Sequence, residues 1–514
     1  MKKLPIGMQT FSELIAGNYY YVDKTQLIAK LASSGKYYFL ARPRRFGKSL
    51  LVSTLKSAFA GEKALFYGLY LQDHWDWSVV CPVIHISFGR GVIDGVEALN
   101  QTFRAMLDES AAHYAIALQQ QLLANRFSEL IRTLRDRFQQ PVVILIDEYD
   151  KPILDNIDHR ERATAIRDGL RNIYSVIKDS DACVRFALLT GVSKFSKVSL
   201  FSGLNNLQDI TLDRQYATLC GYTLEEIKSV FTDRLEGVDF DQLAEWYNGY
   251  NFLGEKVYNP FDILLYLEQR LFKNYWFETG SPSFLIRLVR DRQYSIPDFE
   301  HIVVDEAMLS SFDVDAIALE NLFFQTGYLT IDAVEELGGE FFYHLNYPNR
   351  EVKASLNRHL FQDLTHAQAG LITQQQMQLY KAFSLADLSQ LEQGLRALFA
   401  AIPGDWYRKN QIANYEGYYA SIVYSCFAAL GLTVIAEDVT NHGRIDLTVK
   451  LDKQVFVIEF KVLDKGQEQG AALAQIRGKS YGQKYAASGC TVYLIGIEFD
   501  KAERNIVRFD WQVF

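Results

Sequence analysis

The sequence predicts an α/β protein built from several domains, and three observations lead to this prediction. Its 514 residues exceed what one hydrophobic core usually organises, so two to four domains are expected. A Gly-Lys-Ser tripeptide at residues 47–49 follows a strand-like stretch and precedes a helical one. Near the C-terminus, Asp446 and the tripeptide Glu-Phe-Lys at 459–461 lie on strand-like runs at hairpin spacing. We therefore expect a parallel-sheet domain first and a second α/β domain last.

The first predicted element is a phosphate-binding loop. Residues 36–40 read as a strand, residues 41–49 as a loop and residues 50–60 as a helix. In such a loop, backbone amides bind phosphate, Lys48 reaches the terminal phosphates and the Ser49 hydroxyl binds Mg²⁺. The residues expected around the nucleotide are Arg42, Arg44, Arg45, Phe46, Gly47, Lys48, Ser49 and Leu50. The first of these, an arginine, replaces the first Gly of the usual pattern, a departure that concerns the shape of the loop.

The second half of the expected nucleotide site follows a buried strand. Residues 142–146, Val-Val-Ile-Leu-Ile, are typical of a strand buried on both faces of a parallel sheet. Asp147 is expected to hold the Mg²⁺ shell with Ser49, and Glu148 to polarise the attacking water. The alternative is a polar cap on a core strand. The Gly-Lys-Ser upstream favours the nucleotide site.

A third strand is expected to complete this site. Residues 183–189 read as a strand that leads into a polar loop, where Thr190 or Ser193 could contact the γ-phosphate as a sensor. For Arg44, a solvated position is weighed equally with a phosphate contact. A catalytic arginine supplied by another subunit is not assigned by one sequence; Arg167 and Arg171, after the strand at 142–146, are candidates.

The C-terminal motif predicts a metal-dependent phosphodiesterase site. Side chains alternate along a strand, so Glu459 and Lys461 face the same way while Phe460 packs behind them. A hairpin partner brings Asp446 alongside, and two carboxylates then form a pair of ligands for Mg²⁺. Lys461 would orient a water or neutralise developing charge. The alternative is an ordinary surface Glu/Lys pair; the wholly apolar strand 455–458 argues against it.

Two predicted helices flank this motif. The upstream helix, residues 415–430, carries Glu416 at its start as an extra acid. The downstream helix, residues 470–485, carries Gln475 and Lys479 four residues apart and therefore on one face. Glu416 and Gln475 join the expected catalytic set, and Lys479 is a less favoured neighbour.

Both halves of the chain resemble known families. The loop Arg-Pro-Arg-Arg-Phe-Gly-Lys-Ser at 42–49 resembles that of the AAA-ATPase-like family of bacterial and archaeal proteins, in which an arginine at position 42 is normal. Further stretches typical of that family are residues 21–25, 246–250, 258–261 and 275–280. The C-terminal order of Glu, Asp, Glu-x-Lys and Gln resembles the PD-(D/E)XK nuclease superfamily. The resemblance implies ATP, Mg²⁺ (with Mn²⁺ as a substitute) and nucleic acid as ligands.

The resemblance also suggests a division into domains. We expect an AAA-like P-loop ATPase domain at 1–280, a winged-helix-like lid at 281–360, a helical connector at 361–405 and a nuclease domain at 406–514. Within the lid, residues 321–331 and 340–348 read as a β-hairpin joined near Gly338 and Gly339. Acidic residues at its tip favour a packing lid over a DNA-binding wing.

Composition narrows the class of protein. A net charge of -9 argues against unselective coating of nucleic acid. Five scattered cysteines without a C-x-x-C pair suggest neither a disulfide framework nor a zinc site. Neither an apolar segment of about 18 residues nor a signal peptide is evident. We therefore expect a cytoplasmic protein that does not enter a membrane; a homo-oligomer is compatible with the sequence.

The favoured function is an ATP-binding and ATP-hydrolysing protein that controls a Mg²⁺-dependent DNA endonuclease, with defence against foreign DNA as a role by analogy. A second reading is a nucleotide-dependent switch or scaffold whose nuclease fold binds nucleic acid without cleaving it. A third keeps the nuclease and makes RNA its substrate.

Overall fold

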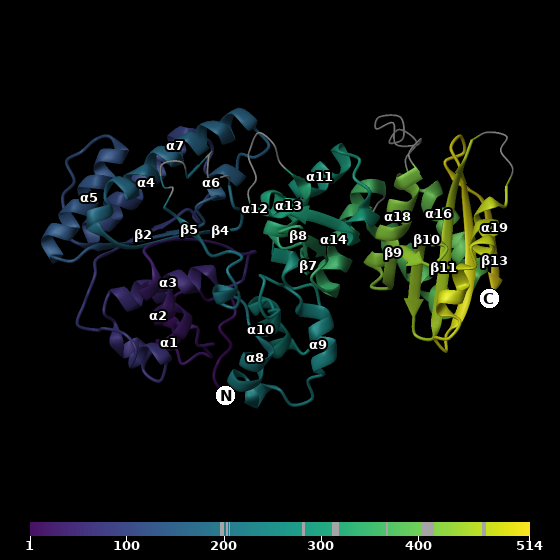
Figure 1. The fold of residues 1–514 in the computed structure, drawn as a ribbon, viewed down its shortest axis with the longest axis horizontal. Helices are drawn as coiled ribbons and strands as arrows, with labels where there is room; N and C mark the ends of the chain where they lie inside the picture. The colour runs from purple at the N-terminus through teal and green to yellow at the C-terminus, as the bar shows by residue number, and fades with distance from the viewer. Residues whose placement is uncertain are drawn as a thin grey trace. The chain divides into compact units, whose positions relative to one another are not determined.

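The computed structural model describes residues 1–195, 200–201, 204, 206–279, 283–310, 318–365, 369–402, 416–464 and 469–514. The chain forms two compact units (Figure 1). One contains Met1–Thr279 and Val303–His344, and the other contains Gly280–Ile302 and Leu345–Phe514. The domain boundaries expected at 280/281 and 405/406 lie outside the described residues, and the one expected at 360/361 falls inside a helix.

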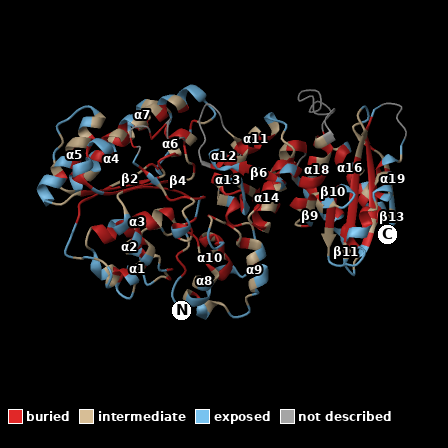
Figure 2. Ribbon diagram, in the orientation of Figure 1, coloured by how far each residue is buried: buried red, intermediate tan, exposed pale blue. Residues whose placement is uncertain are grey.

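The first unit is built on a parallel five-stranded sheet. Its order is β2 (Val83–Ser87), β3 (Val142–Asp147), β4 (Val184–Gly191), β1 (Tyr37–Ala41) and β5 (Gln208–Asp209). Every residue of β1 and β3 is buried, as Figure 2 shows for the sheet. Parallel strands need cover on both faces. In Figure 1, α1–α3 lie on one face of the sheet and α4, α5 and α7 on the other.

The helices of this unit follow their sequence signals. They are α1 (Phe11–Ala16), α2 (Thr25–Ser34), α3 (Lys48–Phe59), α4 (Gly95–His113), α5 (Leu123–Phe138), α6 (Lys151–Leu154), α7 (Arg160–Asp179), α8 (Leu224–Val230), α9 (Phe240–Tyr247) and α10 (Pro260–Gln269). The start of α8 is fixed by a capping box between Thr223 and Glu226. The last three helices form a separate small cluster with the N-terminal segment, around Tyr247 and Tyr258.

The strand order brings three loops to one edge of the sheet. Strand β4 lies between β1 and β3, with Leu40 paired to Thr190 and Ile146 paired to Leu189. All three strands are parallel, so their carboxyl ends meet at the same edge. The three strands expected from the apolar runs are confirmed, with ends shifted by one or two residues.

The hairpin expected at 321–331 and 340–348 is wrong in its first arm. Residues 319–326 form helix α13 (Leu319–Thr326), which ends at Gly327 with φ +89°, and the hairpin consists of β7 (Thr330–Leu337) and β8 (Glu340–Asn346). A short apolar run is ambiguous between strand and buried helix. The glycine stop at 327 is the signal that marks a helix end. Strand β6 (Ile302–Asp305) completes a three-stranded sheet.

The second unit contains a mixed sheet with helices around it. Its order is β13 (Asn505–Val513), β12 (Thr491–Asp500), β11 (Gln454–Leu463), β10 (Gly443–Leu451) and β9 (Thr433–Thr440), and only β11 and β12 run parallel. The other elements of this region are α11 (Ser283–Asp291), α14 (Arg350–Thr365), α15 (Ala369–Ser384), α16 (Leu388–Ala400), α18 (Glu416–Ala429) and α19 (Ala471–Gly478), while α12 (Glu306–Ser310) precedes α13 in the first unit. The cap of α16 is Asp387, which accepts from Gln390 N.

One face of β11 carries aromatic core residues, and the other, which faces α19, carries the residues of the candidate site. Phe456 and Phe460 belong to an aromatic cluster with Phe499 and Phe383. Val455 and Val457 pack with Ile476 of α19 on the other face. Because side chains alternate, Glu459 and Lys461 fall on the α19 face, as the sequence predicts.

Within the described part of the chain, we find no helix both long enough and apolar enough to span a bilayer.

Candidate functional site

The phosphate-binding loop closes around the ammonium group of Lys48. Helix α3 begins at Lys48, directly after Gly47 with φ +93°, and Arg45 also has a left-handed φ of +66°. The Lys48 Nζ donates to the carbonyls of Arg42 at 2.9 Å and Pro43 at 3.0 Å. Burial lowers the pKa of Lys48, and the carboxylates of Asp147 and Asp150 act in the opposite direction. The loop thus holds a cation at the N-terminus of a helix, where an anion is favoured.

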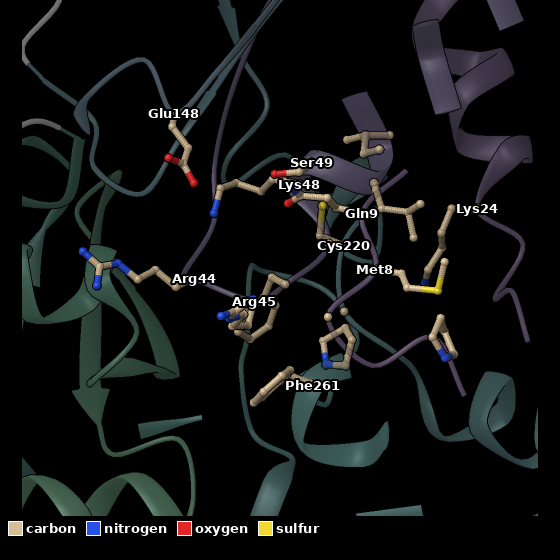
Figure 3. Close-up of a pocket in the computed structure, with 18 of the residues that line it drawn as sticks. Met8, Gln9, Lys24, Arg44, Arg45, Lys48, Ser49, Glu148, Cys220 and Phe261 are labelled. Carbon is tan, nitrogen blue, oxygen red and sulfur yellow. The ribbon is translucent and has the colours of Figure 1, made fainter. Parts of the chain in front are cut away.

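A cavity of about 490 Å³ opens in front of this loop (Figure 3). Residues 44–51 form one wall, and Glu148, Asp150 and Lys151 form another. An apolar end is lined by Met8, Leu14, Tyr21, Val22, Ile28, Phe261 and Leu264. A volume of this size with one charged and one apolar end is typical of a small-ligand site. Arg45 stacks over the Phe261 ring, with 5.1 Å between the guanidinium carbon and the ring centroid.

The side chains of two residues expected around the nucleotide are buried. The Arg42 side chain is 1% exposed, and its Nη1 donates to the carbonyls of Ala41 and Thr211. Its guanidinium lies 3.8 Å from the Phe252 ring centroid. The Phe46 ring is buried against Phe252 and a neighbouring tyrosine. The Arg42 carbonyl accepts from Lys48. Its guanidinium bonds protein carbonyls, so its backbone, and not its side chain, is what it offers to the loop.

The acids after β3 lie at the carboxyl edge of the sheet. Asp147 is 4% exposed, and its Oδ1 accepts from Thr190 Oγ1 at 2.6 Å. Glu148 lines the cavity, in a left-handed conformation with φ +54° that is unusual for a residue with a side chain. A Cβ added at Gly89 would lie 2.9 Å from the Glu148 Oε2. Glycine at 89 therefore leaves room for this carboxylate.

Thr190 and Ser193, the expected sensors, sit behind the cavity. Both are fully buried, and among the described residues neither they nor Asp147 form part of the cavity wall. Thr190 contacts Asp147, so it can position that carboxylate. Ser193 contributes its backbone N–H to Asp150. The helix arginines Arg167 and Arg171 both pair with Asp168.

Asp150 is a site residue that the sequence did not single out. Its Oδ2 accepts from Val192 N at 3.0 Å and Ser193 N at 2.6 Å. Burial raises the pKa of Asp150 to about 6, while those bonds and the Lys48 charge act to lower it. Asp150 thus ties the loop after β4 to the cavity wall. An acid three residues after Asp147 gives no distinctive signal, because its role depends on the fold of a loop 40 residues away.

In the second unit, Asp446 and Glu459 meet just past the stretch in which β10 and β11 are paired. The β10–β11 register pairs Leu447 with Ile458, so the next residues outward are Asp446 and Glu459. Asp446 Oδ2 accepts from the backbone N–H of Phe460 at 2.7 Å. The charge of Asp446 acts on Glu459, and the half-buried Lys461 acts in the opposite direction. The three residues of the sequence motif are therefore brought together.

The Glu459 carboxyl group has one oxygen available to bind a cation. It is 1% exposed, its Oε1 accepts from Gln475 Nε2, and its Oε2 is buried without a hydrogen-bond partner. Burial and the neighbouring Asp446 raise the pKa of Glu459 to about 8, with Lys461 acting to lower it. An orphaned carboxylate oxygen beside a second acid and a lysine fits a hard divalent cation. Over the described ranges, no group of three or more His, Cys, Asp or Glu side chains converges as a metal site.

A tyrosine completes this site where the sequence placed Lys479. Lys479 is exposed just after α19. Tyr481 is 3% exposed; burial, with the Glu459 and Asp446 charges, raises the pKa of its hydroxyl, while Gln475 acts to lower it. A Cβ at Gly443 would lie 2.9 Å from the Tyr481 hydroxyl, so the close approach requires glycine. Sequence reasoning missed Tyr481, because the helix ends at 478 and a new turn redirects the chain.

One expected site residue cannot be placed. Glu416 begins α18, but its side chain lies outside the described residues.

Comparisons with known proteins match both units. A family model described as "Predicted AAA-ATPase" matches residues 5–201, and one described as "PD-(D/E)XK nuclease superfamily" matches residues 414–509. A protein of Azotobacter chroococcum mcd 1, named "Uncharacterized protein in vnfD 5'region", is 51% identical over 509 residues. That alignment covers 99% of this chain and 98% of the relative. The first match includes strands β1–β4, and the second includes β9–β12 and the start of β13.

Proposed function

Because this chain belongs to the AAA-ATPase-like family with a C-terminal PD-(D/E)XK nuclease-superfamily domain, we propose that it binds and hydrolyses ATP and thereby controls a Mg²⁺-dependent DNA endonuclease. Defence against foreign DNA is the role proposed for this activity. The cytoplasmic location and the homo-oligomer expected from the sequence stay predictions.

The proposal for the first unit rests on the Lys48 cavity. Lys48 and the backbone of residues 44–49 would hold the ATP phosphates, while Ser49 and Asp147 would hold the accompanying Mg²⁺. Glu148 would polarise the attacking water. The base would occupy the apolar end beside Met8 and the ring stacked under Arg45.

The observation that carries the nuclease proposal is the orphaned Glu459 oxygen beside Asp446. Asp446 and Glu459 would hold a divalent cation, which supplies water activation and charge stabilisation in phosphodiester hydrolysis. Lys461, on the same strand face, would orient the nucleophile or neutralise developing charge. Gln475 holds one Glu459 oxygen and so fixes the rotation of the carboxylate, leaving the other oxygen for the cation.

A cleavage assay with the purified full chain, Mg²⁺, ATP and duplex DNA tests this function. We expect products from the natural sequence and from Lys453→Ala, which removes an exposed lysine in the β10–β11 turn. Lys461→Ala should lower the cleavage rate at least 100-fold. Equal cleavage by Lys461→Ala would sink the assignment. Tight binding without products in Mg²⁺ and Mn²⁺ would favour the non-cleaving alternative, and preferential cutting of RNA the third.

A further inference from the structure

We infer that the end of α13, residues 325–327, senses the nucleotide and relays its presence to the β7–β8 hairpin. This inference rests on the proposed nucleotide control of the nuclease and names the element that carries the signal. Residues 325–327 contact two loops of the nucleotide site at once. These are the phosphate-binding loop, whose carbonyls accept from Lys48, and the loop after β4, which is bonded to Asp150 beside the Lys48 charge.

The first route runs through the phosphate-binding loop. The Lys48 ammonium has three N–H donors and directs hydrogen bonds to the carbonyls of Arg42 and Pro43. A Cβ added at Gly327 would lie 2.7 Å from the Pro43 ring, so the helix end is pressed against this loop. A phosphate that draws the ammonium therefore acts on Pro43, and through it on Gly327.

The second route runs through the loop after β4. Asp150 faces the Lys48 charge and accepts the N–H groups of Val192 and Ser193. The next N–H, that of Lys194, donates to Gln325 Oε1 at 2.8 Å. A change in the charge balance around Lys48 thus reaches Gln325 through consecutive peptide groups. Gln325 is 6% exposed, and this bond anchors α13 to the nucleotide site.

A third contact strengthens the first route. The Trp276 indole donates to the Arg44 carbonyl at 3.0 Å, and its ring lies 5.3 Å from that of Tyr328. Tyr328 follows Gly327 directly, and Thr330, which begins β7, accepts from Asn251 N at 2.8 Å. The stretch from Gln325 to Thr330 therefore touches the nucleotide site through Gln325, Gly327 and, by way of Trp276, Tyr328, and it continues without a break into the hairpin.

This stretch also has room to move. A second cavity, of about 580 Å³, is lined by Arg42, Pro43, Lys194, Phe324 and Gln325. Close-packed elements cannot shift without displacing neighbours, whereas an element beside a cavity can. Two discrete positions of the helix end would bias the hairpin, and β8 leads along the chain into the second unit at Leu345.

Hydrogen exchange of residues 328–346 in the full chain tests the inference, with and without a non-hydrolysable ATP analogue and Mg²⁺. Gln325→Met removes the acceptor for Lys194 N–H at similar volume, and Gln325→Glu keeps an acceptor oxygen. We expect the nucleotide to change exchange in the hairpin of the natural chain. Gln325→Met should lose more than half of that change, while Gln325→Glu and the control Glu320→Gln on the same helix keep it.

The nucleotide affinity of Gln325→Met should stay within threefold, since Gln325 does not line the nucleotide cavity. In the cleavage assay, its ratio of rates with and without ATP should fall at least fivefold. A hairpin that does not respond in the natural chain while nucleotide binds, or a Gln325→Met hairpin that responds fully, overturns the inference alone. Absence of nucleotide binding by the natural chain overturns the proposed function as well.

Discussion

The nucleotide site and the nuclease site place their acids alike but balance them differently. In both, an acid lies on a buried strand: Asp147 is the last residue of β3, and Glu459 lies within β11. Around Asp147 and Asp150 the protein supplies its own cation, the buried Lys48, and donors from Thr190 and the loop after β4. Around Glu459 one oxygen has no hydrogen-bond partner, and the nearest cation in sequence is the half-buried Lys461.

This difference indicates which ligand each site awaits. A site that already contains a buried ammonium group and a helix N-terminus is complementary to a polyanion such as ATP. A site with two adjacent carboxylates and a raised carboxyl pKa is complementary to a cation. One site therefore suits an anionic ligand and the other a cation. We expect that a substitution in one site leaves the ligand binding of the other unchanged.

The largest expected effect comes from Glu459→Gln. The amide keeps the volume but cannot balance a cation, so DNA cleavage should fall by roughly 10³-fold. Steady-state ATP hydrolysis, measured by phosphate release, should stay within twofold. A variant that still cleaves would mean that the orphaned oxygen is not a metal ligand. Loss of ATP hydrolysis as well would mean that the two sites are not separable.

Glu148→Gln is the corresponding substitution in the proposed nucleotide site. Without a carboxylate to polarise water, ATP hydrolysis should fall by roughly 100-fold. ATP binding, measured by titration calorimetry, should be retained because Lys48 and the loop are unchanged. Nucleotide-dependent DNA cleavage should persist if binding is what signals. Undiminished hydrolysis would remove Glu148 from the catalytic set.

A smaller effect is expected from the tyrosine whose hydroxyl the Glu459, Asp446 and Gln475 side chains influence. Tyr481→Phe removes a hydroxyl beside the carboxylate pair, and DNA cleavage should fall by about threefold to tenfold, the scale of one lost hydrogen bond. Tyr485→Phe is the matched control, because that hydroxyl bonds Asp438, in a separate cluster with Thr448. Equal losses in the two variants would indicate a general effect of packing.

A separate prediction concerns stability against pH and not a rate. The folded protein keeps the Glu459 proton up to about pH 8, whereas an unfolded glutamate releases it near its ordinary value. The folded state therefore binds more protons between these values, and stability falls as pH rises from 5 to 8, by up to about 4 kcal/mol. Thermal unfolding in EDTA should show that fall, and Glu459→Gln should reduce it. An identical pH profile for the variant would contradict the raised pKa.

Much of this organisation could be predicted from local sequence. Continuous apolar runs identify β1, β3 and β4, because strands buried on both faces tolerate few polar residues. The pairing of Asp446 with Glu459 follows from hairpin spacing and side-chain alternation. Both depend on neighbours in the chain, which is why they could be read from one sequence.

The features that the sequence did not predict mostly depend on contacts between residues far apart in the chain. The inward turn of Arg42 requires the Thr211 carbonyl and the Phe252 ring. The role of Asp150 requires the loop after β4, and the approach of Tyr481 requires Gly443. The helix at 319–326 was read as a strand because a short apolar run has no clear period.

The measurement that tests the central claim most directly is the ratio of DNA cleavage rates with and without ATP, in Mg²⁺, for the full chain and for Lys48→Ala. Nucleotide control predicts a ratio of at least about ten for the natural chain, on the scale of allosteric coupling energies, and a ratio near one for Lys48→Ala. A natural chain that cleaves equally fast with and without ATP, while Lys461→Ala does not cleave, would show an independent nuclease and contradict the claim.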